Sequence, residues 1–272
     1  MSYKLSLLVK LNIVGLAFVF MFSNQVQAEN SLEIIYLQRL PFSGDISHQK
    51  SGILLDLSEE IMSSAKLTSN YKAITTWVDA TRYLKAEVNG CFLGSYKTAE
   101  RAKLYKFSQP IYQEQPYIVA ANSALKDRFN EEVLIEDLFD SNFLMGFYEN
   151  FSYGEAIDSK MRTSSNPKIN LHYLTNMQED NFETRNIFSL IDKGRVDYYL
   201  INETEYDWNM HNSGETLNIT KIKLKPTPIG NFRYYMCSNA VPDEIIERLN
   251  KAILQVKKSP QYRQIIKSYN KP

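Results

Sequence analysis

Residues 90–112 read GCFLGSYKTAERAKLYKFSQPIY. An arginine presents a rigid fork of N–H donors that matches the two oxygens of a carboxylate. Thr98 stands three positions before Arg101 and can add a hydroxyl donor on the same side. Such a pair could hold a carboxylate. On these residues alone, a surface arginine that pairs with Glu100 or Glu114 is the favoured interpretation.

Around this stretch, strand-like and helix-like segments alternate. Before it, apolar residues at helical spacing over 53–66 lie between strand-like runs at 32–37 and 71–77, and a second helix is expected over about 80–88. The alternation returns later as strands at 143–148, 170–174 and 197–201, with helices from Ser152 and over 185–193. The pattern predicts an α/β fold with largely parallel strands, built from two units.

Two extended segments connect these units. Residues 116–121 lie between them, and residues 219–237 lead to a final helix that starts at about Pro242. If the chain leaves its first unit near Tyr117 and returns near Lys225, the closing helices rejoin that unit. The expected division is lobe 1, residues 29–119 and 226–272, and an inserted lobe 2, residues 120–225. Two lobes predict a cleft between them.

Residues 1–28 have the order of a cleavable secretory signal peptide. Lys4 and Lys10 make a positive start, an apolar run covers residues 11–22, and small residues before and at Ala28 offer a cleavage site. The alternative is a transmembrane anchor, which needs roughly 20 apolar residues, more than this run supplies. No cysteine lies near the cleavage point to carry a lipid, so we expect a free protein in the periplasm.

The composition gives no sign of a strongly charged partner. The chain has 31 Lys and Arg against 31 Asp and Glu, which does not indicate binding to nucleic acid or to an anionic membrane. His48, His172 and His211 are scattered without metal-ligand spacing, and no Gly-x-Ser-x-Gly or phosphate-loop motif is present. We therefore expect a monomer that needs no cofactor or metal and is not an enzyme.

Cys91 and Cys237 are the two cysteines of the chain. Both lie in strand-like apolar surroundings, and an even count in an exported protein favours a disulfide. Such a bond would close a long loop and stabilise the fold by on the order of 2–4 kcal/mol. Two buried free thiols are the alternative.

Longer motifs carry a resemblance to a known family. Thr98 and Arg101, followed by FSQPIY at 107–112, resemble the T-x-x-R … F-S-x-P-x-Y stretch of bacterial periplasmic solute-binding proteins of family 3. Three further motifs agree in order and spacing: Pro41-Phe42, GILLD at 52–56 and GRVD at 194–197. The resemblance implies a two-lobed type II periplasmic-binding fold with two crossovers between the lobes. It also implies that Arg101 and Thr98 hold the α-carboxylate of a ligand, with main-chain groups near Ser95 and Tyr96 completing the contacts in lobe 1.

Two further contacts are expected. Ser152 has Glu155 three positions on, which is the pattern of a capping box, and the free N–H groups of such a helix start favour an anion. Plain helix capping is the equal alternative. Amino-acid binders of the family often carry an aromatic side chain near Arg39. Here Trp77 is expected to supply a stacking wall instead, unless it packs in the core.

One position departs from the pattern of the family. In its amino-acid binders, an acidic residue five positions after the Asp of Gly-Arg-x-Asp pairs with the ammonium group of the ligand. Counting from Asp197 reaches Asn202 here. An amide brings no charge, and the side chain of Glu203 should point to the other face of a strand. An ordinary α-amino acid is therefore not the expected ligand.

The sequence as a whole predicts a periplasmic solute-binding protein. It would capture a small polar ligand, carboxylate-bearing or amino-acid-like, for an ABC-type transporter, so that its protein partner is an inner-membrane permease. Two alternatives stay open. One is a receptor that reports ligand occupancy to an inner-membrane sensor, and the other is a periplasmic enzyme on the same fold.

Overall fold

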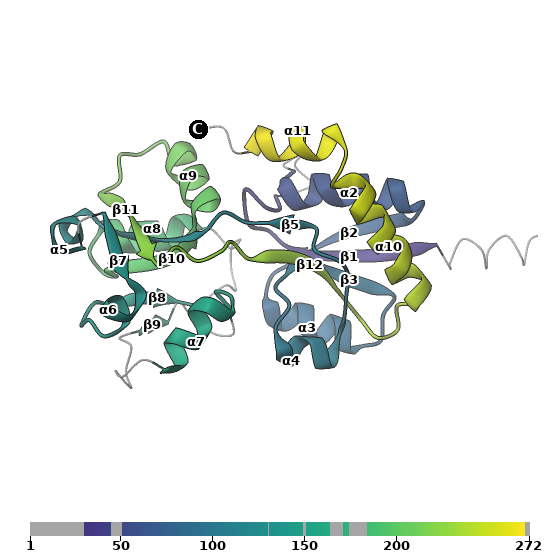
Figure 1. Ribbon diagram of the computed structural model, residues 1–272, viewed down its shortest axis with the longest axis horizontal. Helices are drawn as coiled ribbons and strands as arrows, with labels where there is room; N and C mark the ends of the chain where they lie inside the picture. Colours follow the sequence, from purple (N-terminus) through teal and green to yellow (C-terminus); the bar gives the residue numbers. More distant parts are fainter. Residues whose placement is uncertain are drawn as a thin grey trace, which may run out of the picture.

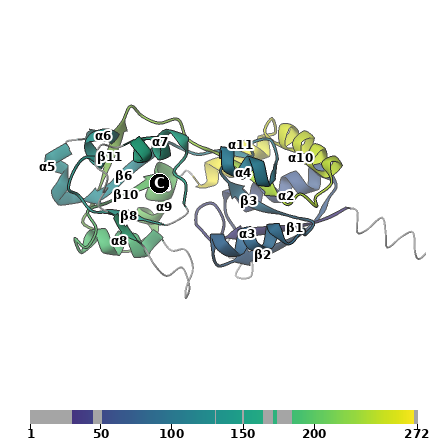
Figure 2. The same cartoon turned by 90° about the horizontal axis from the view of Figure 1, so that it is seen from below.

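The structure is a computed structural model of the 272-residue chain and describes residues 30–44, 51–129, 131–148, 151–163, 171–173 and 184–269. The predicted signal peptide lies outside these residues. Figure 1 shows two lobes side by side, each built around one sheet, and Figure 2 gives the same division from below. Within the described ranges, no helix is both long and apolar enough to cross a bilayer.

The sheet of lobe 1 has the strand order β2-β1-β3-β12-β4. Its strands are β1 (Ser31–Leu37), β2 (Thr68–Ile74), β3 (Gly90–Ser95), β4 (Lys106–Phe107) and β12 (Phe232–Cys237), and β5 (Tyr112–Gln113) pairs with β12. β1 runs parallel to β2 and β3, as predicted, whereas β12 runs antiparallel to β3. All six residues of β3 are buried, because helices cover both faces of this sheet (Figure 1).

The helices of lobe 1 form the two outer layers. They are α2 (Ile53–Ala65), α10 (Asp243–Val256) and α11 (Pro260–Tyr269) on one face, and α3 (Trp77–Lys85) and α4 (Ala99–Leu104) on the other (Figure 1). The apolar side of α2, which includes Leu54, Leu57 and Ile61, packs in one core with β1 and α10. The helix ends at Lys66, whose left-handed backbone, with φ 54°, lets its N–H bond to the carbonyl oxygen of Ser63 at 3.1 Å.

The sheet of lobe 2 has the strand order β7-β11-β6-β10-β8-β9. Its strands are β6 (Tyr117–Asn122), β7 (Glu132–Leu134), β8 (Met145–Phe147), β9 (Leu171–Tyr173), β10 (Tyr198–Asn202) and β11 (Ile219–Lys225). Its helices are the short η2 (Ser123–Leu125), α5 (Lys126–Phe129), α6 (Ile135–Phe139), α7 (Glu155–Thr163), α8 (Thr184–Asp192) and α9 (Glu203–Asn212). β8, β9 and β10 are parallel, and β6 runs antiparallel to both β10 and β11. Both sheets are therefore mixed, because strands next to the crossovers enter them from the opposite direction.

Two expectations about the crossovers need revision. The extended segment at 219–237 is two strands, because β11 pairs in the sheet of lobe 2 and β12 in that of lobe 1. The predicted boundary after residue 119 falls inside β6, all of whose pairs lie in lobe 2. We propose that lobe 2 begins at about Pro116. The return boundary after Lys225, at the end of β11, stays a prediction.

The two crossovers lie against each other. The backbone N–H of Glu114 donates to the carbonyl oxygen of Asn231 at 2.9 Å, and Nε2 of Gln113 donates to that of Gly230 at 3.2 Å. A Cβ atom on Gly230 would lie 1.7 Å from the carbonyl oxygen of Glu114, so this approach of two backbones requires glycine. The connection between the lobes is therefore a pair of bonded segments.

Cys91 and Cys237 form a disulfide, as predicted. They are opposite neighbours on β3 and β12, and both are fully buried. Because lobe 2 lies between them in the sequence, the bond joins the strands of lobe 1 that come before and after the insertion.

One helix of lobe 2, α9, meets lobe 1 at two points. Glu205 forms an ion pair with Arg39, which follows β1. The ring of Trp208 lies 5.9 Å from that of Tyr269 on α11, measured between centroids, and the hydroxyl of Tyr269 donates to Asp56 on α2 at 2.8 Å. This helix thus connects the cleft with the C-terminal helix of lobe 1.

Candidate ligand-binding site

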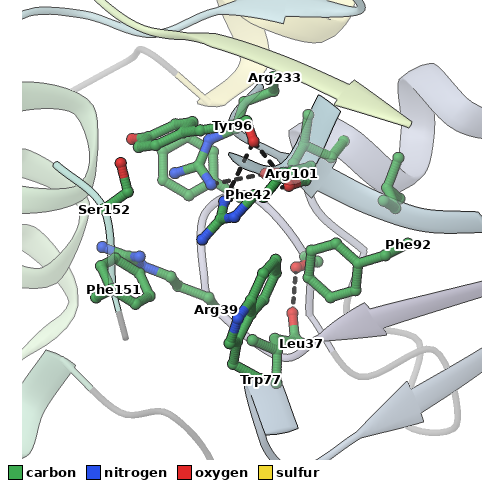
Figure 3. Close-up of a pocket in the computed structure, with 15 residues that line it drawn as sticks. Leu37, Arg39, Phe42, Trp77, Phe92, Tyr96, Arg101, Phe151, Ser152 and Arg233 are labelled. Atoms are coloured by element: carbon green, nitrogen blue, oxygen red, sulfur yellow. Dashed lines mark hydrogen bonds between the residues drawn. The ribbon is translucent and has the colours of Figure 1, made fainter. Parts of the chain in front are cut away.

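A cavity lies between the lobes and contains about 590 Å³ of empty space, part of it open to solvent. Its lining residues are Leu37, Arg39, Phe42, Ser43, Leu54, Trp77, Phe92, Leu93, Gly94, Ser95, Tyr96, Arg101, Phe151, Ser152 and Arg233. Most belong to lobe 1, and Phe151 and Ser152 come from lobe 2 (Figure 3). Among the described residues that form this wall there are three arginines and no Asp or Glu. The wall is therefore apolar with a cationic character.

Arg101 is held by the end of β3 and the start of α4. Its guanidinium donates to the Ser95 hydroxyl at 3.3 Å and to the carbonyl oxygen of Tyr96 at 3.2 Å. It also lies over the ring of Trp77, 4.1 Å from the centroid (Figure 3). The side chain is half-buried, and no carboxylate in the described part of the chain lies within ion-pair distance of it.

The electrostatic surroundings of Arg101 favour an incoming anion. Burial lowers the pKa of Arg101 to about 10, and the carboxylate of Asp158 on α7 in lobe 2 acts in the opposite direction. The guanidinium therefore stays charged at neutral pH while it is poorly solvated. An anion that accepts its remaining N–H groups would relieve this cost.

Thr98 takes a different position from the predicted one. Its hydroxyl accepts a hydrogen bond from the backbone N–H of Arg101 at 3.2 Å, so it is the N-cap of α4. It does not line the cavity. Its contribution here is to fix the start of the helix that carries Arg101, and its predicted contact with a ligand stays a prediction.

A buried ion pair spans the cleft. Nε of Arg39 in lobe 1 donates to Oε1 of Glu205 at 2.7 Å, and its NH2 group donates to Oε2 at 2.5 Å. The side chains are 8% and 0% exposed. Burial opposes the charge of Arg39, but the attraction of Glu205 outweighs it, and the pKa of Arg39 is raised well above its usual value. The guanidinium also lies over the ring of Phe151, 4.9 Å from the centroid (Figure 3).

Asn202 serves this ion pair and does not reach the cavity. Its side-chain oxygen accepts from the backbone N–H of Glu205 at 2.9 Å, which caps α9, and its NH2 group donates to Oε2 of Glu205 at 3.1 Å. Asn202 is fully buried and absent from the cavity wall. The neighbouring Glu203 points away, to Lys221 at 2.9 Å. The carboxylate at this place in the fold is therefore that of Glu205.

A second buried network stands where the crossovers leave lobe 1. Nε of Arg233 donates to Oε1 of Glu114 at 2.7 Å, and its NH1 donates to the carbonyl oxygen of Gly94 at 2.8 Å. The hydroxyl of Tyr96 donates to the other oxygen of Glu114 at 2.5 Å and lies 3.0 Å from the hydroxyl of Tyr117 in lobe 2. Glu114 is fully covered, with a side-chain exposure of 0%. Burial, together with Glu114, raises the pKa of Tyr96, so this residue stays a neutral donor.

Ser152 lines the cavity from lobe 2, but the predicted capping box with Glu155 is wrong. The helix begins only at Glu155, and the Ser152 hydroxyl donates to Asp158 at 2.6 Å and accepts from the N–H of Gly154 at 3.1 Å. The N–H of Tyr153 donates to the other oxygen of Asp158 at 2.9 Å. The acidic partner of Ser152 is therefore Asp158, three residues after the Glu155 that the local pattern indicated.

The structure brings together five of the seven residues predicted for the ligand site. Arg101, Ser95, Tyr96, Trp77 and Ser152 line one cavity, and Thr98 and Asn202 stand behind it. Sequence reasoning missed the ion pairs Arg39–Glu205 and Arg233–Glu114 and the aromatic wall of Phe42, Phe92 and Phe151. Within the described ranges, no group of three or more His, Cys, Asp or Glu side chains is placed to hold a metal ion.

Fold and site together define a class of protein. Two α/β lobes, joined by two crossovers and enclosing a cavity, form the type II periplasmic-binding fold. The sequence profile of the bacterial extracellular solute-binding proteins, family 3, matches residues 35–272. The chain belongs to this family. Among curated proteins, none matches the sequence.

Solved structures support the fold at low sequence identity. An ancestral arginine-binding protein bound to glutamine is 16% identical with a TM-score of 0.66, and the match covers 88% of this chain and 97% of that one. The amino acid ABC transporter substrate-binding protein AbpA from Streptococcus pneumoniae, bound to L-arginine, is 16% identical with a TM-score of 0.67 over 91% and 97%. The GluR0 ligand-binding core from Nostoc punctiforme in complex with L-glutamate is 14% identical with a TM-score of 0.66 over 89% and 100%.

Proposed function

We propose that the protein is a periplasmic solute-binding protein that holds a small carboxylate-bearing ligand between its lobes and delivers it to an ABC-type transporter. The observation that carries this proposal is Arg101. It is a poorly solvated guanidinium on the cavity wall with no carboxylate of the described chain at ion-pair distance. A ligand carboxylate is the natural partner of such a group.

The cavity supports a two-sided mode of binding. The carboxylate would accept from Arg101, and the body of the ligand would lie against the aromatic side chains of Trp77, Phe92 and Phe151. Because Phe151 and Ser152 belong to lobe 2, a ligand in this place touches both lobes and favours the state in which they are closed. A membrane permease would then read the closed arrangement of the two lobes.

Export fits this role. The family consists of extracellular solute-binding proteins, and we propose that residues 1–28 direct the chain to the periplasm and are removed after about Ala28. Solved structures on the same fold include amino acid ABC transporter substrate-binding proteins. A sensor receptor remains the alternative partner arrangement, since the same closure of lobes would serve it equally.

An enzymatic function has less support. One structure on the same fold is that of AncCDT-1, an ancestral amino-acid-binding protein described as a precursor of cyclohexadienyl dehydratase, with 15% identity and a TM-score of 0.66. Proton-transfer chemistry in this cavity would call for a side chain such as His, Asp, Glu, Lys or Tyr. Of these types the described lining residues contain only Tyr96, whose hydroxyl donates to Glu114 and whose pKa is raised by burial. Turnover of a bound ligand by the purified protein would revive this alternative.

The test starts from a thermal-shift screen of the mature protein against monocarboxylates, dicarboxylates, amino acids and small sugars, because a ligand of the native state raises Tm. For the best ligand, Arg101→Ala should weaken binding roughly 10- to 100-fold, the range for a lost charge-assisted hydrogen bond. Lys103→Ala is the matched control, since Lys103 is an exposed cation on the same helix. Binding to Arg101→Ala within threefold of wild type would refute the role of Arg101.

A further inference from the structure

We propose that the ligand is a carboxylate without an ammonium group. This inference rests on the proposed function and narrows its ligand class. It is based on the ion pair that crosses the cleft. The guanidinium of Arg39 in lobe 1 is paired with the buried carboxylate of Glu205 in lobe 2. The ammonium group of a ligand would need an acidic partner. At Glu205, a cation of the protein already takes that place.

Glu205 is closed to a ligand in this arrangement. Its Oε1 accepts from Nε of Arg39, and its Oε2 accepts from NH2 of Arg39 and from the NH2 group of Asn202. The side chain is 0% exposed, and it is Arg39, not Glu205, that lines the cavity. Aromatic packing of Arg39 on Phe151 further holds the guanidinium in place.

Two other carboxylates of the described residues near the cavity, those of Glu114 and Asp158, are also engaged. Glu114 is fully covered and accepts from Arg233 and Tyr96. Both oxygens of Asp158 accept hydrogen bonds, from the Ser152 hydroxyl and from the N–H of Tyr153. All three acidic groups therefore have protein donors, and none of them lies on the described wall of the cavity.

The three arginines of the cavity wall differ in whether a carboxylate of the described chain pairs with them. Arg39 and Arg233 face the cavity with their charges matched by Glu205 and Glu114, while Arg101 donates only to neutral oxygens in the described chain. A ligand carboxylate would accept hydrogen bonds from the guanidinium of Arg101 and balance its charge. An ammonium group on the same ligand would lose its water among guanidinium and aromatic groups without gaining a carboxylate of the described residues. The site should therefore prefer the deaminated form of any ligand that it accepts.

The experiment compares matched pairs that differ in the amino group. The pairs are L-leucine and 4-methylpentanoate, L-phenylalanine and 3-phenylpropanoate, and L-glutamate and glutarate, each titrated into the mature wild-type protein by calorimetry. In the pair that binds, the deaminated member should bind at least about tenfold more tightly, because burying a polar group without a partner is costly. An equal or tighter Kd for the amino acid would overturn the inference and leave the proposed function standing.

Binding by no member of any pair would overturn the inference and, with it, the proposal that this cavity takes small carboxylates. For a pair that does bind, loss of binding in Arg101→Ala shows that the carboxylate is held at Arg101, whichever member of the pair binds more tightly. In this way a wrong ligand class and a wrong binding site give different results.

Two variants test the mechanism. Arg39→Met keeps an apolar stem of similar length and uncovers Glu205, so the preference for the deaminated member should shrink at least tenfold or reverse. Arg39→Met/Glu205→Gln removes both charges, so the preference should return to that of wild type. An unchanged preference in Arg39→Met, shown to be folded by its thermal transition, would overturn the inference. If Arg39→Met does not fold, the wild-type pairs decide alone.

Discussion

Loss of the disulfide should lower the stability of the protein by a large amount. Cys91 and Cys237 stand 146 positions apart, and the loop between them contains all of lobe 2. In the chain-entropy model, closing a loop of this length stabilises the native state by about 5 kcal/mol at 25 °C, and measured values are more often about 2–4 kcal/mol. We therefore expect the loss to lie between about 2 and 5 kcal/mol. This bond would then contribute a substantial part of the free energy of unfolding.

The assay is guanidinium chloride unfolding of the mature oxidised protein, followed by circular dichroism, against the Cys91→Ala/Cys237→Ala variant. Wild-type protein unfolded in the presence of a reductant is the control, because it loses the cross-link in the unfolded state while the buried native side chains stay unchanged. A difference below about 1 kcal/mol between the oxidised and reduced wild type would refute the entropic reasoning. Two alkylatable thiols in the non-reduced, unfolded protein would refute the disulfide itself.

Two further predictions concern the buried polar groups. Glu114→Gln leaves the Arg233 guanidinium buried without its counter-charge and should lower the free energy of unfolding by about 3–5 kcal/mol. Glu132→Gln, in an exposed ion pair, is the control and should change the unfolding midpoint little. Equal effects of the two variants would contradict this prediction. Burial raises the pKa of Tyr112 and of Tyr148 to about 12, so the unfolded chain releases these protons first, at about pH 10. Stability should therefore fall as the pH rises from about 10 to 12, and unfolding midpoints that stay constant over this range would count against it.

Local patterns predicted the framework of the fold. The apolar spacing over 53–66 gave α2, and the stretch at 90–112 gave the family, because both depend on residues close together in the chain. The direction of β12 was not predictable in this way. It depends on the path that the chain takes back from lobe 2, which the residues of β12 do not encode.

In the candidate site, too, the residues expected from the sequence belong to short recognisable stretches, whereas contacts between distant residues were missed. Arg101 was expected there from the family motif around it, and Trp77 from its place just before a helix; both signals lie in short stretches of sequence, and both residues line the cavity. The contact between Arg39 and Glu205 joins residues 166 positions apart in different lobes, and no local pattern reports it. One signal was available: Asn202 followed three positions later by Glu205 is an N-cap pattern that indicated where the carboxylate lies.

The positions of the tryptophans give the protein a built-in optical reporter. The chain has two, and the indole of Trp77 lies 4.1 Å from the Arg101 guanidinium, while that of Trp208 meets Tyr269 across the lobes. On the proposed function, a ligand carboxylate at Arg101 would change the charge beside the first indole, and separation of the lobes would change the solvent around the second. Intrinsic fluorescence of the unlabelled protein would then have one emitter for occupancy and one for closure, and Trp208→Phe would isolate the first signal from the second.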